Sequence, residues 1–188
     1  MVTLTIDNRT VTVPEGTTIL EAARSARLDI PTLCYLKDIN EIGACRLCLV
    51  EVSEGGKPFR LVTACVYPCT EGMEIKTNTP RIINSRKMNL ELLLSNHDKK
   101  CLSCPRNTNC ELQQLCREYG VEDENRFAGS MTNAVVDTSS LAIVRNNAKC
   151  ILCRRCSAVC EKVQKVGVIG PIMRGMNTQI STPWGMTL

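Results

Sequence analysis

The first residues of the chain alternate hydrophobic and polar side chains with the period of two that is typical of β-strands. The alternation runs over residues 1–6 and again over residues 10–13, and the turn-forming pair Asp7-Asn8 separates the two runs. This pattern predicts a β-hairpin. Residues 15–18 are suited to capping a helix, and apolar residues follow at helical spacing until Pro31 ends the segment.

Further strands are predicted for residues 49–52 and 61–63, on either side of the turn Glu54-Gly55-Gly56. A hairpin, a helix and then more strands is the order of elements in a small β-grasp, or ubiquitin-like, domain. We therefore predict a domain of this kind for residues 1–78.

A helical segment is predicted next. Thr79 and Pro80 suit the N-cap and the first helical position, and the apolar positions after them predict a helix to about Asn96. A second helix is predicted to end at Gly120. The Ser-, Thr- and Asn-bearing connection over residues 129–140 is the predicted domain boundary, so that the second domain comprises residues 79–138.

The remaining residues, 139–188, are predicted to form a third, smaller part. Short strands are expected over residues 141–144 and 166–169, the latter closed by Gly170-Pro171, with a helix between them that runs through Val163. The tail shows no clear element. The whole chain is thus predicted to be an α+β protein in three parts.

Composition changes this picture mainly through cysteine. The 188 residues include 13 cysteines, whereas aromatic residues make up only 3%, so the core must rely on aliphatic side chains and on whatever the cysteines bind. An odd number of cysteines without a secretory leader favours metal sites over disulfides, and indicates a reducing cytoplasm. The net charge of +4 forms no single stripe, which argues against nucleic acid, and the apolar runs are too short for a membrane span.

Residues 150–160 read C-x₂-C-x₂-C-x₃-C, the spacing with which bacterial ferredoxins hold [4Fe–4S] clusters. Cys150, Cys153 and Cys156 can reach three corners of one cube, while Cys160 points toward a neighbouring cluster. Zinc usually takes cysteines as separated pairs, so this spacing argues against zinc. The second run of such a ferredoxin does not follow before Leu188, and we expect a truncated ferredoxin-like half-domain.

Four earlier cysteines form another constellation, with the spacing C-x₁₀-C-x₂-C-x₁₆-C: Cys34, Cys45, Cys48 and Cys65. This spacing is a variant of the plant-type ferredoxin pattern, with a longer first interval, and predicts a [2Fe–2S] cluster. Cys69 is a rival for the fourth position. Cys65 is favoured because it directly follows a predicted strand.

The chain's one histidine stands in a third constellation, H-x₃-C-x₂-C-x₅-C, formed by His97, Cys101, Cys104 and Cys110. Four donors within fourteen residues predict a metal site, and spacing alone leaves open a zinc site of the Cys₃His type. Cys116 falls on the apolar face of the next predicted helix, where a core position suits it better than a ligand role.

Taken in this order, the three constellations resemble the N-terminal accessory region of [FeFe]-hydrogenase catalytic subunits of the NAD(P)-linked, bifurcating type. They are also similar to the large iron–sulfur subunit of complex I and to the small diaphorase subunit of NAD-reducing [NiFe]-hydrogenases. The resemblance covers nearly the whole chain and rests on residues 31–35, 43–52, 63–65, 96–110 and 149–160.

The resemblance implies a role for each donor. It makes the first four cysteines ligands of a [2Fe–2S] cluster, and His97 with its three cysteines ligands of a His-coordinated [4Fe–4S] cluster. It gives Cys150, Cys153 and Cys156 to a ferredoxin-type [4Fe–4S] cluster and Cys160 to a neighbouring one. Glu161 departs from the family pattern, in which a proline often follows the fourth cysteine.

The sequence shows no nucleotide-binding loop, no catalytic base or nucleophile arrangement, and no cysteine motifs for a hydrogen-activating cluster. We therefore expect an electron-transfer module of a multi-subunit hydrogenase-type oxidoreductase, which relays single electrons to a catalytic centre elsewhere. The expected partners are flavin- and NAD(P)-binding subunits and iron–sulfur subunits, with ferredoxin as a further candidate. Two alternatives stay open: a complete small iron–sulfur subunit of a diaphorase or NADH dehydrogenase module, and a zinc-stabilised interaction protein without a redox role.

Overall fold

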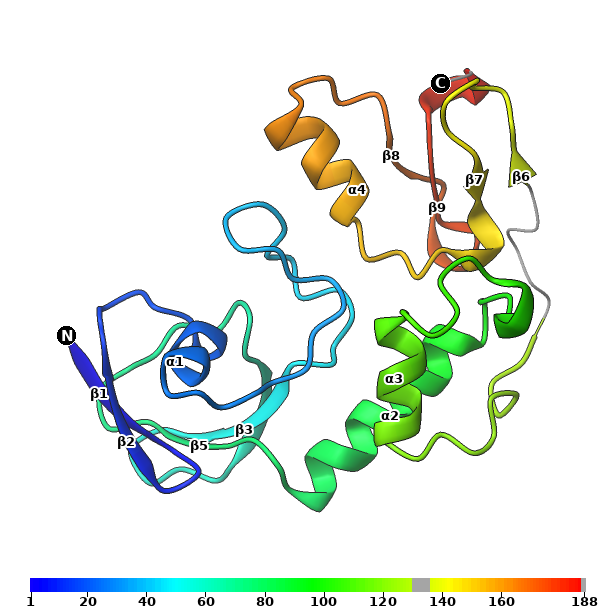
Figure 1. Cartoon of the computed structure of the whole chain (residues 1–188). Helices are drawn as coiled ribbons and strands as arrows, with labels where there is room; N and C mark the ends of the chain where they lie inside the picture. Colours follow the sequence, from blue (N-terminus) through cyan, green and yellow to red (C-terminus); the bar gives the residue numbers. More distant parts are fainter. Residues whose placement is uncertain (130–135, 187–188) are drawn as a thin grey trace. The chain divides into compact units, whose positions relative to one another are not determined.

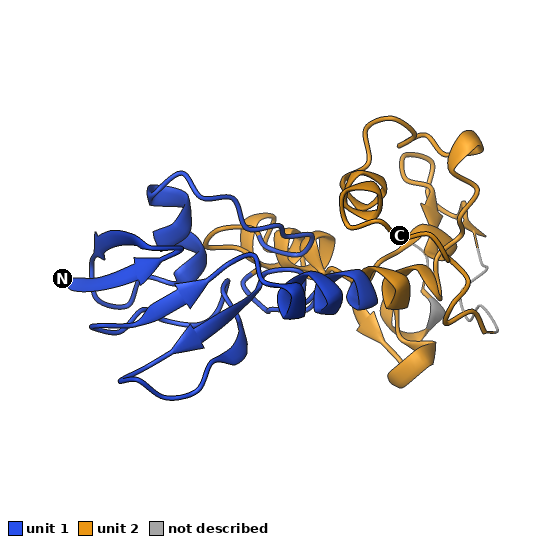
Figure 2. Cartoon of the chain, turned by 90° about the horizontal axis from the view of Figure 1, so that it is seen from below, with its two compact units in different colours: residues 1–35, 41–89 blue, residues 36–40, 90–188 orange. Residues whose placement is uncertain are grey.

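Figure 1 shows the computed structural model of the chain, which describes residues 1–129 and 136–186. The chain divides into two compact units, one of residues 1–35 and 41–89, and one of residues 36–40 and 90–188 (Figure 2). The three domains predicted from the sequence stay a prediction. Residues 130–135 of the connection predicted as a boundary lie outside the described residues.

A five-stranded sheet forms the basis of the first unit. Its strands lie in the spatial order β2-β1-β5-β3-β4, and their bounds are β1 Val2–Ile6, β2 Arg9–Val13, β3 Leu49–Ser53, β4 Arg60–Thr63 and β5 Glu74–Lys76. The predicted hairpin is confirmed: β1 and β2 pair antiparallel, and Asp7 and Asn8 between them have the positive φ angles that suit a tight hairpin turn. β5 pairs in parallel with β1. It has only three residues and was not predicted from the sequence.

Helix α1 (Ile19–Ser25) contributes one wall of the core of this unit. Thr18 caps it, because its hydroxyl accepts a hydrogen bond from the Glu21 amide at 3.3 Å. Ile19, Leu20 and the helix alanines join the buried side chains of the strands in one cluster. As expected from the composition, the buried members of that cluster are aliphatic apart from Tyr35, Met73 and three cysteines.

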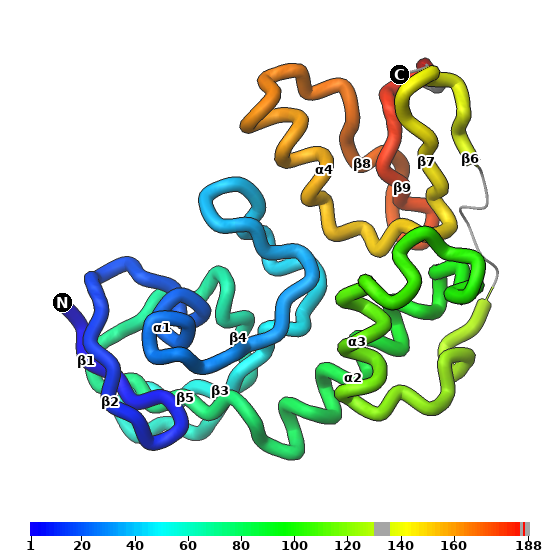
Figure 3. The backbone as a smooth tube through the Cα atoms, in the orientation of Figure 1, coloured from blue at the N-terminus to red at the C-terminus, as the bar shows by residue number. Residues whose placement is uncertain are grey.

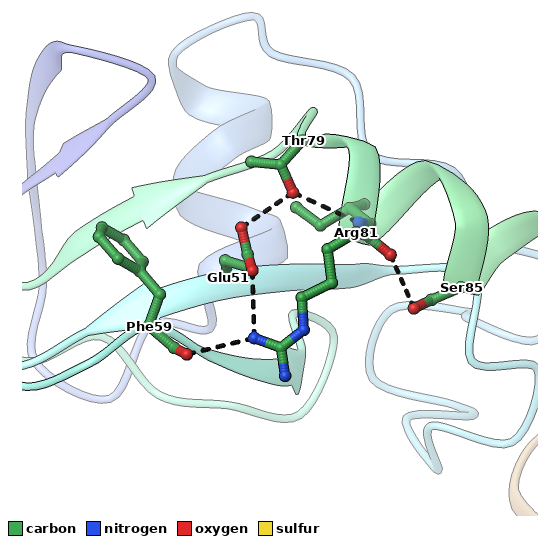
Figure 4. A network of polar contacts seen from close by, with 6 residues as sticks. Glu51, Phe59, Thr79, Arg81 and Ser85 are labelled. Carbon is green, nitrogen blue, oxygen red and sulfur yellow. Dashed lines mark hydrogen bonds and ion pairs between the residues drawn. The ribbon is translucent and has the colours of Figure 1, made fainter.

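Helix α2 (Pro80–Leu94) begins at the predicted residue, and its first turn is tied to β3 (Figure 4). The Thr79 hydroxyl accepts a hydrogen bond from the Ile82 amide at 3.3 Å and donates one to the Glu51 carboxylate at 2.8 Å. Arg81 pairs with the same carboxylate at 3.3 Å. The Glu51 side chain is only 11% exposed, so these contacts supply the partners that a nearly buried charge requires.

The second unit consists of short elements, namely α3 Glu111–Glu118, β6 Val136–Asp137, β7 Arg145–Asn146, α4 Arg155–Ala158, β8 Gly170–Ile172 and β9 Gln179–Ser181. The strands form two antiparallel pairs, β6 with β7 and β8 with β9. α3 ends before Gly120, whose φ of +58° is that of a helix-terminating glycine, as predicted. α4 continues as a π-helical turn, Val159–Val163, so the predicted helix does run through Val163.

Three predictions for the C-terminal part are wrong. Residues 141–144 form no strand, because Leu141 is fully exposed and pairing begins only at Arg145. Residues 166–169 also form no strand, since the left-handed backbone of Lys165 and Gly167 interrupts an extended run. The strand comes after them, as β8, and its partner β9 lies in the tail, for which no element was predicted; Figure 3 traces this return of the chain.

Candidate metal centres

The first cysteine constellation is buried in the first unit. Cys48 directly precedes β3 and Cys65 lies two residues beyond the end of β4, so the sheet itself brings these two together, with their Sγ atoms 3.3 Å apart. The side chains of Cys34 and Cys45 form a second, hydrogen-bonded pair. All four side chains are at most 6% exposed. Two pairs of thiols is the arrangement that a [2Fe–2S] rhomb requires, because each of its irons takes two thiolates.

Backbone amides point at the sulfur atoms of this site. The Cys45 amide donates to Cys34 Sγ at 3.5 Å, and the Leu33 amide donates to Cys45 Sγ at 3.4 Å. The loop can turn its amides inward because Gly43 and Arg46 have left-handed φ angles of +62° and +57°. Hydrogen bonds to sulfur stabilise negative charge there, which is one of the means by which proteins set cluster potentials.

Within each pair, one thiol is acidified by the other. The thiol of Cys34 lowers the pKa of Cys45 to about 5, and the same hydrogen bond raises the pKa of Cys34. The hydrogen bond between Cys48 and Cys65 likewise lowers the pKa of Cys48 and raises that of Cys65. In each pair the hydrogen bond therefore favours the thiolate form of one cysteine, and the thiolate is the form of cysteine that binds a metal.

Cys69, the rival for the fourth position, lies in the hydrophobic core among apolar side chains. It is 3% exposed, and burial raises the pKa of its thiol to about 11. A buried, protonated thiol behaves as a small apolar side chain. This environment supports the prediction that Cys69 is no ligand.

Three residues of the second constellation line a cavity of about 280 Å³ in the second unit. His97, whose amide donates to the Leu94 carbonyl at 3.2 Å just beyond α2, lines this cavity with Cys101 and Cys110. Cys110 is the N-cap residue of α3. Cys104 is partly exposed and is not among the lining residues, whereas Cys116 is. The structure thus brings three of the four predicted donors to one cavity.

Cys116 was predicted to lie in the core, and its position in the wall of this cavity was not predicted. It is partly exposed, and burial raises the pKa of its thiol to about 11. It comes one helical turn after the buried Leu112, so it shares that residue's face of α3. The sequence showed this face, but nothing in it indicated that the face borders a cavity.

The His97 ring suits a ligand of iron. Its Nδ1 atom is buried and has no hydrogen-bond partner among the described residues. Burial is also the main cause that lowers the pKa of His97, which favours the neutral imidazole that binds metals. An orphaned buried nitrogen beside two thiols fits a metal-ligating role.

The third constellation begins on a loop with an uncommon backbone. Leu152 and Arg154 have φ angles of +54° and +61°, although neither is glycine, and the Leu152 amide donates to Cys150 Sγ at 3.4 Å. Cys153 lies between these two residues. The two remaining cysteines of the run follow in α4 and in the π-helical turn, at Cys156 and Cys160.

The second and third constellations lie next to each other in the second unit. The amide of Asp98, the neighbour of His97, donates to the Ala148 carbonyl at 2.6 Å. Lys149, which precedes Cys150, pairs with the Asp98 carboxylate at 3.8 Å. These contacts join the segment that carries His97 to the segment that carries the third cysteine run.

Across residues 1–129 and 136–186, no three His, Cys, Asp or Glu side chains are close enough together to hold a single metal ion. The donors are instead spread in pairs or around a cavity.

Comparison with known proteins agrees with this chemistry. Residues 1–80 match the family described as a 2Fe-2S iron-sulfur cluster binding domain, and residues 86–125 match the NADH-ubiquinone oxidoreductase-G iron-sulfur binding region. The chain is therefore an iron–sulfur protein that binds both [2Fe–2S] and [4Fe–4S] clusters. The second match favours an iron–sulfur cluster over the zinc site that spacing alone left open at His97 and its three cysteines.

The chain is similar to parts of larger redox subunits. It is 42% identical, over its whole length, to the NADP-reducing hydrogenase subunit HndD of Solidesulfovibrio fructosivorans, of which it covers 32%. It is 37% identical over 97% of its length to the NADH-ubiquinone oxidoreductase 75 kDa subunit of Reclinomonas americana, of which it covers 26%. The chain thus spans about a third or less of these curated relatives.

A solved structure shares its fold. A chain from the NAD⁺-reducing [NiFe]-hydrogenase in the H₂-reduced state superposes with a TM-score of 0.88, over 98% of this chain and 76% of that one, at 26% identity. Together with the two family matches, this places the mixed α+β fold among iron–sulfur domains of hydrogenases and NADH-ubiquinone oxidoreductases. None of the helices in the described part of the chain is long and apolar enough to cross a membrane.

Proposed function

We propose that the chain is the electron-transfer module of an NAD(P)-linked, hydrogenase-type oxidoreductase. It relays single electrons between its clusters, toward a catalytic centre that lies outside these 188 residues. The observation that carries the proposal is the gathering of four buried cysteines into two pairs, in the part of the chain that matches a 2Fe-2S binding domain. The [FeFe]-hydrogenase type is the narrower form of the proposal, and the similarity to HndD supports it.

The proposed ligand sets are those of the sequence analysis. Cys34, Cys45, Cys48 and Cys65 hold the [2Fe–2S] cluster; His97, Cys101, Cys104 and Cys110 hold a [4Fe–4S] cluster; and Cys150, Cys153 and Cys156 contribute to a third, with Cys160 serving a neighbouring cluster. For Cys104 this requires its side chain to turn toward the cavity that the other three donors share.

When bound, the clusters supply one-electron oxidation and reduction. The chain's own residues set the conditions. Burial of the four paired cysteines keeps water from their sulfur atoms, and the amides of Leu33 and Cys45 stabilise negative charge on them. A neutral His97 leaves its site less negative than a fourth thiolate would, which raises the reduction potential of that site. The contact between Asp98 and Ala148 keeps the second and third sites adjacent for transfer.

The proposed partners are a flavin- and NAD(P)-binding subunit and iron–sulfur subunits, with ferredoxin as a further candidate. The names of the relatives support this, since they are subunits of an NADP-reducing hydrogenase and an NADH-ubiquinone oxidoreductase.

The second candidate is a small iron–sulfur subunit that connects a flavin subunit to a separate catalytic subunit in a diaphorase. One observation favours it: the chain covers 76% of the solved hydrogenase chain, a far larger share than it covers of HndD. Co-purification with an affinity-tagged chain from its native cell separates the two candidates. The first predicts that the hydrogen-activating centre belongs to the same polypeptide, and the second predicts that it belongs to another.

Metal analysis of the anaerobically purified protein tests what both candidates share. We expect a brown protein with iron and acid-labile sulfide in amounts that account for at least one [2Fe–2S] and one [4Fe–4S] cluster. A colourless protein with stoichiometric zinc and negligible sulfide would overturn both candidates.

A further inference from the structure

Asn40 is a polar residue that is only 2% exposed, and its backbone takes part in a hydrogen-bonded turn. The Asn40 amide donates to the Leu36 carbonyl at 2.8 Å, and the Leu36 amide donates back to the Asn40 carbonyl at 3.1 Å. Asp38, between them, has a left-handed φ of +61°. The turn over residues 36–40 belongs to the second unit (Figure 2), although it follows directly on the segment of Cys34.

The side chain of Asn40 reaches the third cysteine run. Its Nδ2 donates to the carbonyl of Cys153 at 2.9 Å, across 113 positions of sequence and within the same unit. Cys153 stands between Leu152 and Arg154, the two residues with left-handed backbone. Two such residues around one position form an unfavourable conformation, which persists only where the surroundings hold it.

We propose that Asn40 is a positioning residue of the third iron–sulfur site. Its side-chain amide holds the Cys150–Cys156 loop in the conformation that presents the cysteine sulfur atoms to iron. The inference rests on the proposed function, since it takes this loop to be a cluster loop. It adds a residue that no cysteine spacing indicates, from a turn more than one hundred positions upstream. A carbonyl that loses this donor is left to find another partner, and the loop then relaxes away from its left-handed backbone.

The chain contains a matching arrangement at the first site. The side chain of Asn89 donates through Nδ2 to the carbonyl of Arg46 at 3.0 Å. Arg46 also has a left-handed φ, of +57°, and lies between Cys45 and Cys48. Asn89 therefore provides an internal control: the same side chain makes the same bond to a cysteine loop, but at a different cluster.

The test compares Asn40→Asp with Asn89→Asp in the full chain, purified anaerobically. Aspartate keeps the shape of asparagine but its carboxylate cannot donate to a carbonyl. Iron loss to a chelator is followed by EPR, which resolves the clusters. Because partners that orient metal ligands typically contribute 10- to 100-fold to metal retention, we expect Asn40→Asp to lose the third cluster at least about 10-fold faster, with the other two unchanged.

Asn89→Asp should show the reverse, with faster loss of the [2Fe–2S] cluster alone. Asn40→Gln, which keeps the donor, should recover part of the retention that Asn40→Asp loses, an effect that mere destabilisation of the fold would not give. Equal retention of the third cluster in Asn40→Asp and the unmodified chain would overturn the inference, and so would equal loss of all three clusters. Absence of any iron–sulfur signal from the unmodified chain would instead overturn the proposed function, and this is seen before any substitution is made.

Discussion

At the scale of single residues, the imidazole of His97 is the donor that distinguishes the second site from an all-cysteine one. In His97→Cys an anionic thiolate replaces a neutral ligand, so the cluster becomes more negative and harder to reduce. We expect its reduction potential to fall by on the order of 100 mV, since two histidines raise Rieske potentials by several hundred mV. An EPR-monitored potentiometric titration measures the shift.

His97→Ala is the companion variant, because it removes the donor without replacing it. The cluster should then be lost on gel filtration, while the [2Fe–2S] signal of the first unit stays intact. If both variants keep the second cluster with its original potential, His97 is only a residue near the end of α2.

Cys65 and Cys69 offer a matched pair of substitutions. Both thiols are at most 3% exposed and both belong to the same buried cluster of side chains, so serine introduces a similar buried hydroxyl at either position. Cys65→Ser should lower the [2Fe–2S] content to a minor fraction, and Cys69→Ser should retain it while reducing the free energy of unfolding by about 1–3 kcal/mol. The reverse pattern, measured by visible spectroscopy and denaturant unfolding, would make Cys69 the fourth ligand.

The identities of the candidate donors could be predicted from spacing, but their surroundings could not. Nothing in the sequence indicated that Cys34 pairs with Cys45, since that pairing depends on the left-handed backbone of Gly43 and Arg46. Asn40 gave no signal either, because its contact with Cys153 joins segments that are distant in sequence.

At the scale of elements, the start of α2 depends on one hydroxyl that serves two partners. Thr79→Ala removes the N-cap of the helix and a donor to the nearly buried Glu51 carboxylate. We expect the free energy of unfolding to fall by about 1–2 kcal/mol, as measured by urea denaturation. Ser85→Ala is the control, because that hydroxyl donates only to the exposed Arg81 carbonyl within the same helix (Figure 4) and should change stability by less than about 0.5 kcal/mol. Equal losses in the two variants would contradict the assigned role of Thr79.

Elements with local signals were predicted well, and those made by pairing alone were not. The hairpin of β1 and β2 has a turn signal and clean alternation, and α1 and α2 have capping residues, so local sequence determines them. β5 and the strands of the second unit have two or three residues each, too few to show a period. Their positions depend on the partner strand, as β8 shows by starting at Gly170 and not in the preceding valine-containing run.

At the scale of the whole molecule, the main feature is that three sets of candidate cluster ligands follow one another along the chain. A sheet-based unit carries the first set, and the second unit carries the other two next to each other. An electron-transfer module requires such a series, because each one-electron step needs a neighbouring acceptor. The sequence predicted this series from its motifs, and the structure adds the contacts that keep the second and third sets together.

A redox titration followed by EPR spectroscopy is the sharpest test of whether the chain carries electrons on two kinds of iron–sulfur cluster. With the protein reduced in steps under anaerobic conditions, we predict at least two distinct signals: one from a slowly relaxing [2Fe–2S] centre, and one from a fast-relaxing [4Fe–4S] centre that is visible only at lower temperature. Each should appear at its own potential and integrate to about one spin per chain. If the protein is folded and carries bound metal but shows no reducible signal at any potential, it is not an electron-transfer module.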